Sequence, residues 1–343
     1  MNQLARASAV AGAVVALATG LVVAPAAAPA PAAAASSATV TPATIRTAPA
    51  STVYLGGLHV DTTATAATAA TKLAAQGLAA EAEAARTIAA QPIATWLGSW
   101  HDDVMLVKVI QRTLVAAEAK GRTPVFVTYD IPGRDCGGYS GGGAADDAAY
   151  LRWNQLVADT LRGHRAVVLV EPDSLGHLSS CPALTATRTA TIAAAVAALA
   201  DAGVPAYLDG GNSNWVKAAD MAARLRAAGV DRARGFFTNV ASYYGVDAER
   251  AYADSVSAAL GGTHYVIDVS RNGRGWRGTW CNAPGAGLGQ TPRVVSTTTG
   301  TSGLDALLWV KTPGASDGPC GGGPAAGTWF PAYAVALVAN RAP

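Results

Sequence analysis

The chain has 343 residues, of which half are hydrophobic and only 14% are charged. A chain this long and this apolar can bury a substantial core, which excludes a globally disordered protein. The 25 basic and 23 acidic residues leave a net charge of +2, and the sequence contains no long run of Lys or Arg. We therefore expect no nucleic-acid partner, because binding a polyanion requires a basic field.

The N-terminal segment has the pattern of a secretory signal peptide. Arg6 precedes an apolar run over residues 9–23, which is followed by prolines and the small residues Ala32–Ala35. A membrane anchor is the alternative, but the run is short, rich in Ala and followed by prolines. We predict a signal peptide over residues 1–35, a flexible Ala/Thr/Pro-rich leader over 36–51, and a single domain over 52–343. The mature protein is then secreted, extracellular and free of the membrane.

Four cysteines form an even set, and export places them in an oxidising compartment, so we expect two disulfides. Three pairings are open at this point. No two cysteines lie within a few residues of each other, so the spacing resembles no zinc site, and we expect neither a metal nor a cofactor. The four residues are Cys136, Cys181, Cys281 and Cys320.

The mature chain alternates between helical stretches and short apolar runs. The Ala-rich stretch over 62–90 predicts a helix. Seven apolar runs follow, continuous rather than alternating, as is typical of buried parallel strands: 94–97, 124–129, 166–170, 206–208, 235–240, 265–269 and 307–310. Helical patterns separate most of them, over 147–162, 187–202, 218–228 and 247–260. The alternation predicts an α/β fold whose seven parallel strands form a closed or nearly closed barrel. A doubly wound open sheet is the alternative, but no G-x-G-x-x-G follows the first strand.

Polar residues gather where these strands end. In a parallel barrel those positions share the C-terminal rim, where barrel enzymes build their sites. One such carboxylate is usually a helix cap or a turn residue, whereas several from separate strands predict a functional site. Because like charges repel, at least one should have a raised pKa, which suits acid catalysis. The carboxylates are Asp130, Asp135, Glu171, Asp173, Asp209, Asp268 and Asp317.

Tryptophans flank the same strand ends. An indole face packs well against a sugar ring, and carboxylates beside it bind the hydroxyl groups or act on the glycosidic bond, so the combination predicts a glycoside hydrolase. For Trp153, Trp309 and Trp329 we favour core packing instead. The rim tryptophans are Trp96, Trp100, Trp215, Trp276 and Trp280.

Two segments carry a family resemblance. Tyr129–Cys136, which reads YDIPGRDC, and Leu169–Leu175, which reads LVEPDSL, resemble the two signatures of glycoside hydrolase family 6, the cellulases. Five shorter blocks resemble the family in the same order, so the resemblance covers residues 54–343: Tyr207–Asp209, Thr238–Val240, Ser270–Gly273, Trp280–Cys281 and Trp309–Lys311.

The resemblance implies a distorted parallel barrel related to the TIM barrel, with a cleft at its C-terminal rim and inverting hydrolysis of β-1,4-glucan. It implies that Asp173 is the general acid and that Asp135 lies nearby and raises the pKa of this acid. Asp317 resembles the carboxylate proposed as base, acting directly or through a water chain. Tyr129 resembles the residue that crowds the distorted sugar at the cleavage point.

The resemblance also implies substrate contacts and the nearest-neighbour cysteine pairing, Cys136–Cys181 and Cys281–Cys320. Ser140 is a candidate for positioning the attacking water. The implied sugar-binding residues are Trp96, Asp209, Trp215, Asn239, Trp280 and Lys311.

Two positions depart from the family pattern. Ala315 stands where the family commonly has Glu, and Asn212 stands where it has His, so we expect altered affinity but an intact acid. The short Asp317–Cys320 segment predicts an open cleft, and hence an endoglucanase that cleaves internal bonds. We also expect the protein to be a monomer. A cellobiohydrolase-type exo-acting enzyme and an inactive glucan-binding barrel are the alternatives.

Overall fold

The computed structural model describes residues 11–13, 42–184, 186–295 and 303–341. The chain divides into two compact units, residues 1–38 and 39–343. Within the first unit only residues 11–13 are described, and they have no regular secondary structure, so the predicted signal peptide otherwise lies outside the described residues. Among the described residues, no helix is both long enough and apolar enough to cross a membrane.

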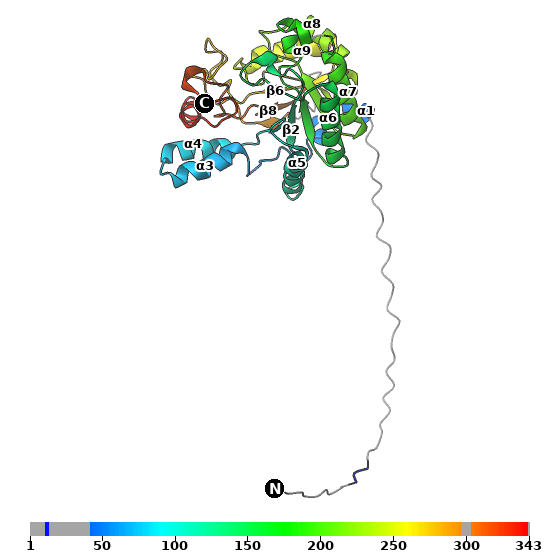
Figure 1. Cartoon of the computed structure of the whole chain (residues 1–343), viewed down its shortest axis with the longest axis vertical. Helices are drawn as coiled ribbons and strands as arrows, with labels where there is room; N and C mark the ends of the chain where they lie inside the picture. The colour runs from blue at the N-terminus through cyan, green and yellow to red at the C-terminus, as the bar shows by residue number, and fades with distance from the viewer. Residues whose placement is uncertain (1–10, 14–41, 185, 296–302, 342–343) are drawn as a thin grey trace. The chain divides into compact units, whose positions relative to one another are not determined.

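The centre of the second unit is a curled, eight-stranded sheet (Figure 1). Seven of its strands are parallel and adjacent in chain order, which confirms the predicted barrel strands: β1 (Thr95–Gly98), β2 (Val125–Tyr129), β3 (Val167–Val170), β4 (Ala206–Asp209), β5 (Gly235–Thr238), β6 (His264–Asp268) and β8 (Leu304–Leu308). The eighth, β7 (Arg293–Val294), pairs antiparallel with β8 and was not predicted, because two residues carry no periodic signal. A parallel bridge between Ile93 and Trp309 links the two ends of the parallel set, so the sheet forms a distorted, nearly closed barrel.

Helices follow the strands and cover the outside of the sheet (Figure 1). Four confirm predicted helices: α6 (Asp147–Leu161), α7 (Arg188–Asp201), α8 (Ala218–Ala227) and α9 (Val246–Ala259). The sequence analysis missed α5 (Asp103–Glu118) and α10 (Pro331–Ala339). Short 3₁₀ turns complete the described elements: η1 (Asp135–Gly137), η2 (Gly176–Ser179), η3 (Pro182–Leu184), η4 (Val230–Arg232) and η5 (Cys320–Gly322).

Both faces of the strands are buried, which explains their continuous apolar sequences. On β2, Phe126 packs in the larger cluster with residues of the helices, whereas Val127 packs in the cluster that fills the barrel interior. Because side chains alternate along a strand, the same register directs the last residues of β2, β4 and β6 to the interior side of the C-terminal rim. These residues are Tyr129, Asp209 and Asp268.

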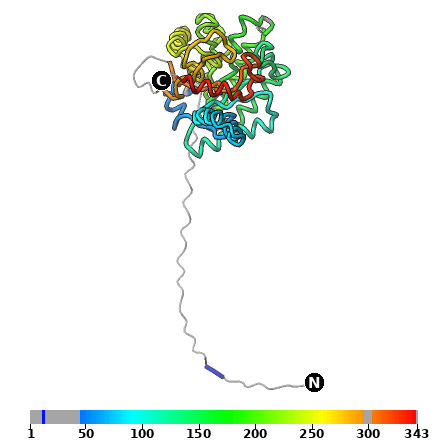
Figure 2. Tube along the Cα trace, turned by 90° about the vertical axis from the view of Figure 1, so that its left-hand side faces the viewer, coloured from blue at the N-terminus to red at the C-terminus, as the bar shows by residue number. Residues whose placement is uncertain are grey.

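The helix predicted over residues 62–90 is in fact two helices, α3 (Thr65–Ala75) and α4 (Ala79–Ala89). Gly77 lies between them with φ +76°, a left-handed conformation that ends a helix and favours glycine. The hairpin buries small side chains such as Ala69 and Ala85 and packs against Trp329 and α10 (Figures 1 and 2). Because the segment is rich in Ala on both sides of Gly77, its composition did not indicate that the helix ends there.

Part of the leader predicted over residues 36–51 is helical, from residue 42 onwards. Residues 42–53 form α1 (Pro42–Thr47) and α2 (Ala50–Val53), and Ile45 is buried. The guanidinium of Arg234 donates hydrogen bonds to the carbonyl oxygens of Ile45 and Arg46 at 2.9 and 3.0 Å. This tether comes from a residue almost 190 positions away, so local composition could not reveal it.

Arg234 also forms a buried ion pair. Its Nε and Nη2 donate to the two carboxylate oxygens of Asp305 at 2.8 and 2.9 Å, and both side chains are at most 2% exposed. His264 and the hydroxyl of Tyr207 also bond to Asp305. Burial alone would raise the pKa of Asp305, but hydrogen bonds from His264 and Arg234 and the charge of Arg234 lower it. The cluster therefore joins four segments of the fold through one carboxylate.

We expect Arg234→Met to destabilise the protein by about 3–5 kcal/mol, since it removes the cationic partner of a buried carboxylate, which then has His264 and Tyr207 as partners. Urea unfolding at pH 7 measures the change. Arg232→Met is the matched control, because Arg232 pairs with Asp201 at the surface and such pairs are worth less than about 1 kcal/mol. Equal losses in the two variants would contradict the assignment.

Candidate active site

The loops that leave the C-terminal ends of the strands are strained. All seven non-glycine residues with positive φ among the described residues lie in loops after β2, β3, β5 or β6. Each such residue costs on the order of 1–3 kcal/mol and usually marks a functional site. They include three of the predicted catalytic or sugar-binding residues, Asp135, Asp173 and Asn239. The seven are Asp135, Cys136, Glu171, Asp173, Asn239, Ala241 and Asn282.

Asp173 has the electrostatics of a general acid. It lies just after β3 with φ +70° and remains partly accessible to solvent. Burial and the negative charges of Asp209 and Asp135 raise the pKa of Asp173 to about 7, against the opposing charges of His177 and Lys311. The main charged neighbour is thus Asp209, with Asp135 contributing less. A carboxyl with this pKa is protonated across the acidic pH range, as proton donation requires.

Asp135 faces His177, a residue that the sequence analysis did not select. The imidazole Nε2 lies 3.4 Å from Oδ1 of Asp135, and the backbone N–H of Ser140 donates to Oδ2 at 2.8 Å. The hydrogen bond with Asp135 is the largest cause that raises the pKa of His177, and the charges of Asp173 and Asp209 add to it. Asp135 is therefore held on both of its oxygens.

Glu171 connects the two signature segments. It is fully buried, and its carboxylate accepts the backbone N–H groups of Asp130 and Ile131 at 3.0–3.1 Å. Burial raises the pKa of Glu171 to about 7, against these hydrogen bonds. The residue that follows β3 thus fixes the start of the loop that carries Asp135.

Two disulfides brace the rim and confirm the expected pairing. Cys136 bonds to Cys181 with a Cα–Cα distance of 6.1 Å, and Cys281 bonds to Cys320 with 6.2 Å. The first joins the loop after β2 to the loop after β3. The second joins the loop after β6 to the loop after β8, which carries Asp317.

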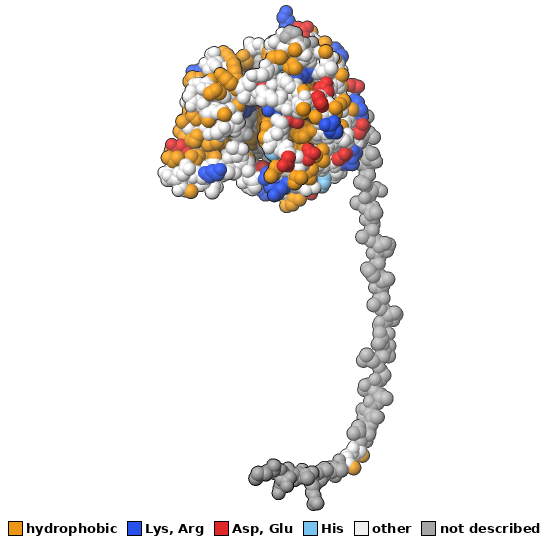
Figure 3. Space-filling model, in the orientation of Figure 1, with side chains coloured by type: hydrophobic (Ala, Val, Ile, Leu, Met, Phe, Trp, Pro, Cys, Tyr) orange, Lys and Arg blue, Asp and Glu red, His pale blue; other side chains and the backbone are white. Residues whose placement is uncertain are grey.

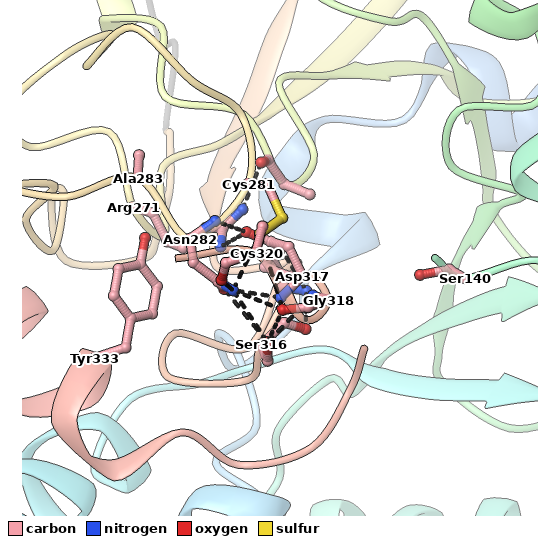
Figure 4. Close-up of polar contacts among 12 residues, drawn as sticks. Ser140, Arg271, Cys281, Asn282, Ala283, Ser316, Asp317, Gly318, Cys320 and Tyr333 are labelled. Atoms are coloured by element: carbon pink, nitrogen blue, oxygen red, sulfur yellow. Dashed lines mark hydrogen bonds and ion pairs between the residues drawn. A yellow bond between two sulfur atoms is a disulfide. The ribbon is translucent and has the colours of Figure 1, made fainter. Parts of the chain in front are cut away.

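Asp317 is a buried anion between two cations, of which Figure 4 shows Arg271. Arg271 Nη1 lies 2.7 Å from Oδ2, Lys311 Nζ lies 3.0 Å from Oδ1, and the backbone N–H of Asn282 donates to Oδ2 at 2.9 Å. Burial opposes the shift, but Arg271 and Lys311 hold the pKa of Asp317 well below its usual range. Such a carboxylate has low proton affinity and is by itself a weak base. These contacts do not test the role of base that the family resemblance implies for Asp317, and the role proposed below is to fix the two cations.

Ser140 does not join this cluster. Its backbone N–H bonds to Asp135, its carbonyl accepts from Nε of Arg134 at 2.8 Å, and Figure 4 shows it well apart from Asp317. Its predicted role in positioning the attacking water stays a prediction.

Asp209 and Asn239 are buried parts of the loop framework. Both oxygens of Asp209 accept backbone N–H groups, those of Leu175, Gly176 and Gly211, at 2.9–3.0 Å. Asn239 donates to the carbonyl oxygens of Tyr244 and Asp268. Burial raises the pKa of Asp209 in spite of these hydrogen bonds. Their predicted roles as sugar contacts remain predictions.

The rim aromatics lie on several sides of the carboxylates. Trp96 is edge-on to Tyr129, with ring centroids 5.1 Å apart, and its Nε1 donates to the carbonyl of Val310. Trp215 is edge-on to His177 at 5.0 Å. Trp280, 55% exposed, lies 5.9 Å from Tyr139, which is 52% exposed. Exposed flat rings beside carboxylates are suited to stack on sugar rings.

The other tryptophans divide as predicted. Trp153 and Trp309 are buried, and Trp329 is partly buried against the α3–α4 hairpin. Trp100 and Trp276 are exposed, and Trp276 stacks on Tyr244 with an interplanar angle of 9°. On the face shown in Figure 3, hydrophobic and uncharged side chains prevail, and acidic and basic groups are interspersed.

Most of the chain matches a known enzyme family. The model of glycosyl hydrolases family 6 matches residues 56–341. The chain belongs to this family. Endoglucanase A of Cellulomonas fimi is 41% identical over 249 residues, which make up 73% of this chain but only 54% of that protein. Endoglucanase 1 of Streptomyces halstedii is 39% identical over 259 residues, or 72% of this chain and 78% of that protein.

A solved structure of the endoglucanase Cel6 from Mycobacterium tuberculosis, in complex with methyl-cellobiosyl-4-deoxy-4-thio-β-D-cellobioside, has the same fold. Its TM-score is 0.75 at 39% identity, over 82% of this chain and 96% of that chain. The family 6 resemblance and the distorted barrel predicted for the chain are thereby confirmed.

The two departures from the family pattern are accommodated in this family 6 chain. Asn212 is almost buried; its amide donates to Ser242 Oγ at 3.1 Å and its carbonyl accepts the N–H of Asn214. Ala315 is buried and forms an antiparallel bridge with Trp329. Both positions therefore support loops. In the described part of the chain, no group of three or more His, Cys, Asp or Glu residues could hold a metal ion.

The raised pKa of Asp173 has a consequence for stability. A carboxyl whose pKa is about 7 in the folded state and 3.8 in the reference state binds more protons when folded, so stability falls as pH rises from about 4 to 7. We expect Asp173→Asn to gain about 1–3 kcal/mol over the wild type across this window. Urea unfolding at pH 4, 5.5 and 7.5 measures the gain, and a pH-independent difference would contradict it.

Proposed function

We propose that the mature chain is a secreted, inverting endo-β-1,4-glucanase with Asp173 as general acid. The observation that carries the proposal is the carboxyl of Asp173, which has a pKa of about 7 and lies with Asp135 on a rim that also carries exposed tryptophans. Hydrolysis of a glycosidic bond needs a protonated carboxyl at the leaving oxygen, and stacking rings hold the sugars on either side.

In the proposed reaction, Asp173 gives its proton to the glycosidic oxygen as the bond from that oxygen to the anomeric carbon breaks. A water molecule attacks the anomeric carbon from the opposite face and loses a proton, so the product has the α configuration. Tyr129, buried beside Trp96, crowds the sugar at the cleavage point. The proton lost by water returns Asp173 to its acid form through the solvent. Asp317 supports the site as an anion that fixes Lys311 and Arg271.

The substrate assignment is supported by the relatives. Those at 37–41% identity are named endoglucanases. Relatives named exoglucanases are 31–32% identical, and Endoglucanase-6B of Humicola insolens is also 31% identical. The neighbour from Mycobacterium tuberculosis is an endoglucanase in complex with a thio-linked cellobioside. In this chain only Gly318 and Pro319 separate Asp317 from the disulfide-bonded Cys320, which favours an open cleft.

Secretion and a monomeric state belong to the same proposal. Two disulfides form and persist in an oxidising compartment. A polysaccharide that cannot enter a cell must also be cleaved outside it.

Product analysis tests the proposal. We expect cello-oligosaccharides to be cut at internal bonds, the first product observed by ¹H NMR to be the α-anomer, and the viscosity of a soluble cellulose derivative to fall faster than reducing ends appear. Release of cellobiose with little loss of viscosity would favour the exo-acting alternative. Binding of cello-oligosaccharide without any cleavage would favour an inactive glucan-binding barrel.

A further inference from the structure

His177 has no role in the proposed chemistry, although it lies within the acid site. It belongs to the loop after β3, four residues beyond Asp173, and its backbone N–H donates to the carbonyl of Asp173 at 2.9 Å. Its ring nitrogens face Asp135 at 3.4 Å and Ser180 Oγ at 3.3 Å. One short turn thus connects Asp173 to His177. Among the ion pairs of the described residues, His177 is the partner of Asp135.

The loop of His177 is anchored from three directions. Asp209, at the end of β4, accepts the N–H groups of Leu175 and Gly176, and Arg224 from α8 donates to the carbonyl of Leu175 at 2.6 Å. The Cys136–Cys181 disulfide then ties this loop to the residue that follows Asp135, and the N–H of Cys181 donates to the carbonyl of His177 at 2.8 Å. A ring held so firmly can set the position of the carboxylate that it faces.

The opposite side of the ring is fixed by Trp215. The two rings are edge-on, with centroids 5.0 Å apart and an interplanar angle of 83°. A Cβ at Gly176 would lie 2.6 Å from atoms of the Trp215 ring, so glycine at this position allows the close approach. The imidazole of His177 therefore lies between Trp215, a predicted sugar-binding residue, and Asp135.

We propose that His177 is a positioning residue, whose imidazolium pairs with Asp135 and fixes that carboxylate beside Asp173. The proposal deepens the glucanase assignment and, for its catalytic consequence, rests on it. Three carboxylates face the ring: Asp135 after β2, Asp173 on its own loop and Asp209 at the end of β4. The imidazolium offsets part of their charge, so Asp173 loses its proton at a lower pH than it would beside an uncompensated Asp135. Lys311, after β8, acts on Asp173 in the same direction.

The activity test compares pH profiles. His177→Gln keeps a donor of similar length but removes the positive charge. We expect kcat/KM on a cello-oligosaccharide to fall about tenfold, and the alkaline limb of the profile to move up by about one pH unit, because Asp173 then keeps its proton longer. KM should change less than kcat. A loss of rate that is equal at every pH would show that His177 only supports the loop and would overturn the proposal.

The matched control is His164→Gln. His164 lies between α6 and β3 and pairs with Glu118, the last residue of α5, at 2.7 Å. Both side chains are exposed. This variant should keep the wild-type rate and pH profile. A shift of the alkaline limb in the control as large as that in His177→Gln would also overturn the proposal.

A titration independent of activity tests the pair itself. The chain has five histidines, so the ring signals can be followed by NMR, and the signal missing from His177→Gln identifies His177. We expect Asp135→Asn to lower the titration midpoint of His177 by about one unit. An unchanged midpoint would overturn the proposal even if the wild type hydrolyses glucan. If the wild type were inactive, the proposed function would fail while this titration still decided the pairing.

Discussion

Asp173→Ala is expected to lower the rate of cellulose hydrolysis by about two to four orders of magnitude, the usual contribution of general acid catalysis. An unactivated glucan has a poor leaving group, so its glycosidic oxygen must be protonated as the bond breaks. Asp173 is the carboxyl of the rim whose burial, with the charges of Asp209 and Asp135, brings its pKa to about 7. Initial rates of reducing-end release from a defined cello-oligosaccharide measure the loss.

A substrate with a good leaving group separates this role from a structural one. An aryl cellobioside whose phenol is acidic needs little protonation, so the same variant should retain far more of its activity on it. Asp135→Ala should instead lower the rate and shift the pH profile, because Asp135 acts through the pKa of Asp173. Equal losses for Asp173→Ala on both substrates would remove Asp173 from the role of acid.

The arrangement of the carboxylates was accessible from the sequence because it follows from strand periodicity. Continuous apolar runs predicted parallel strands, and parallel strands bring their C-terminal ends to one rim. Asp209 and Asp268 are the last residues of β4 and β6, and Asp173 follows β3 closely, so an error of one or two residues in a strand boundary did not affect the prediction. The two signature segments and the disulfide pairing came from the family resemblance.

Other parts of the site depend on contacts between residues far apart in the chain. Arg271 lies within a segment that resembled the family, but its burial against Asp317, 46 residues away, was not visible in the sequence. His177 reaches Asp135 only because a disulfide and the anchored loop bring the two loops together. The same reason explains why the sequence did not reveal the helices within residues 42–51 of the predicted leader: Arg234, which bonds to the carbonyl of Ile45, lies 189 residues further along the chain.

Asp317→Asn is expected to lower both stability and activity. The amide keeps the shape of the side chain but leaves Arg271, which is fully buried, without its anion. Breaking a buried pair by removing one partner costs about 3–5 kcal/mol. Lys311 also loses its contact at 3.0 Å and retains the hydrogen bond to the carbonyl of Ser316 at 3.4 Å. We expect the rate of glucan hydrolysis to fall at least about a hundredfold, measured below the lowered unfolding temperature, and the urea midpoint to fall with it.

A double variant and azide distinguish the two contributions of Asp317. Arg271→Met combined with Asp317→Asn removes the uncompensated buried charge, so it should recover part of the lost stability while hydrolysis remains impaired.

Azide added to Asp317→Ala tests whether Asp317 is the base. Azide replaces a missing base by attacking the anomeric carbon itself, which would yield an α-glycosyl azide from an inverting enzyme. We expect no such product, because Arg271 and Lys311 keep the proton affinity of Asp317 low and its contribution is to fix these cations at the cleft. Formation of the α-azide would instead establish Asp317 as the base that activates water.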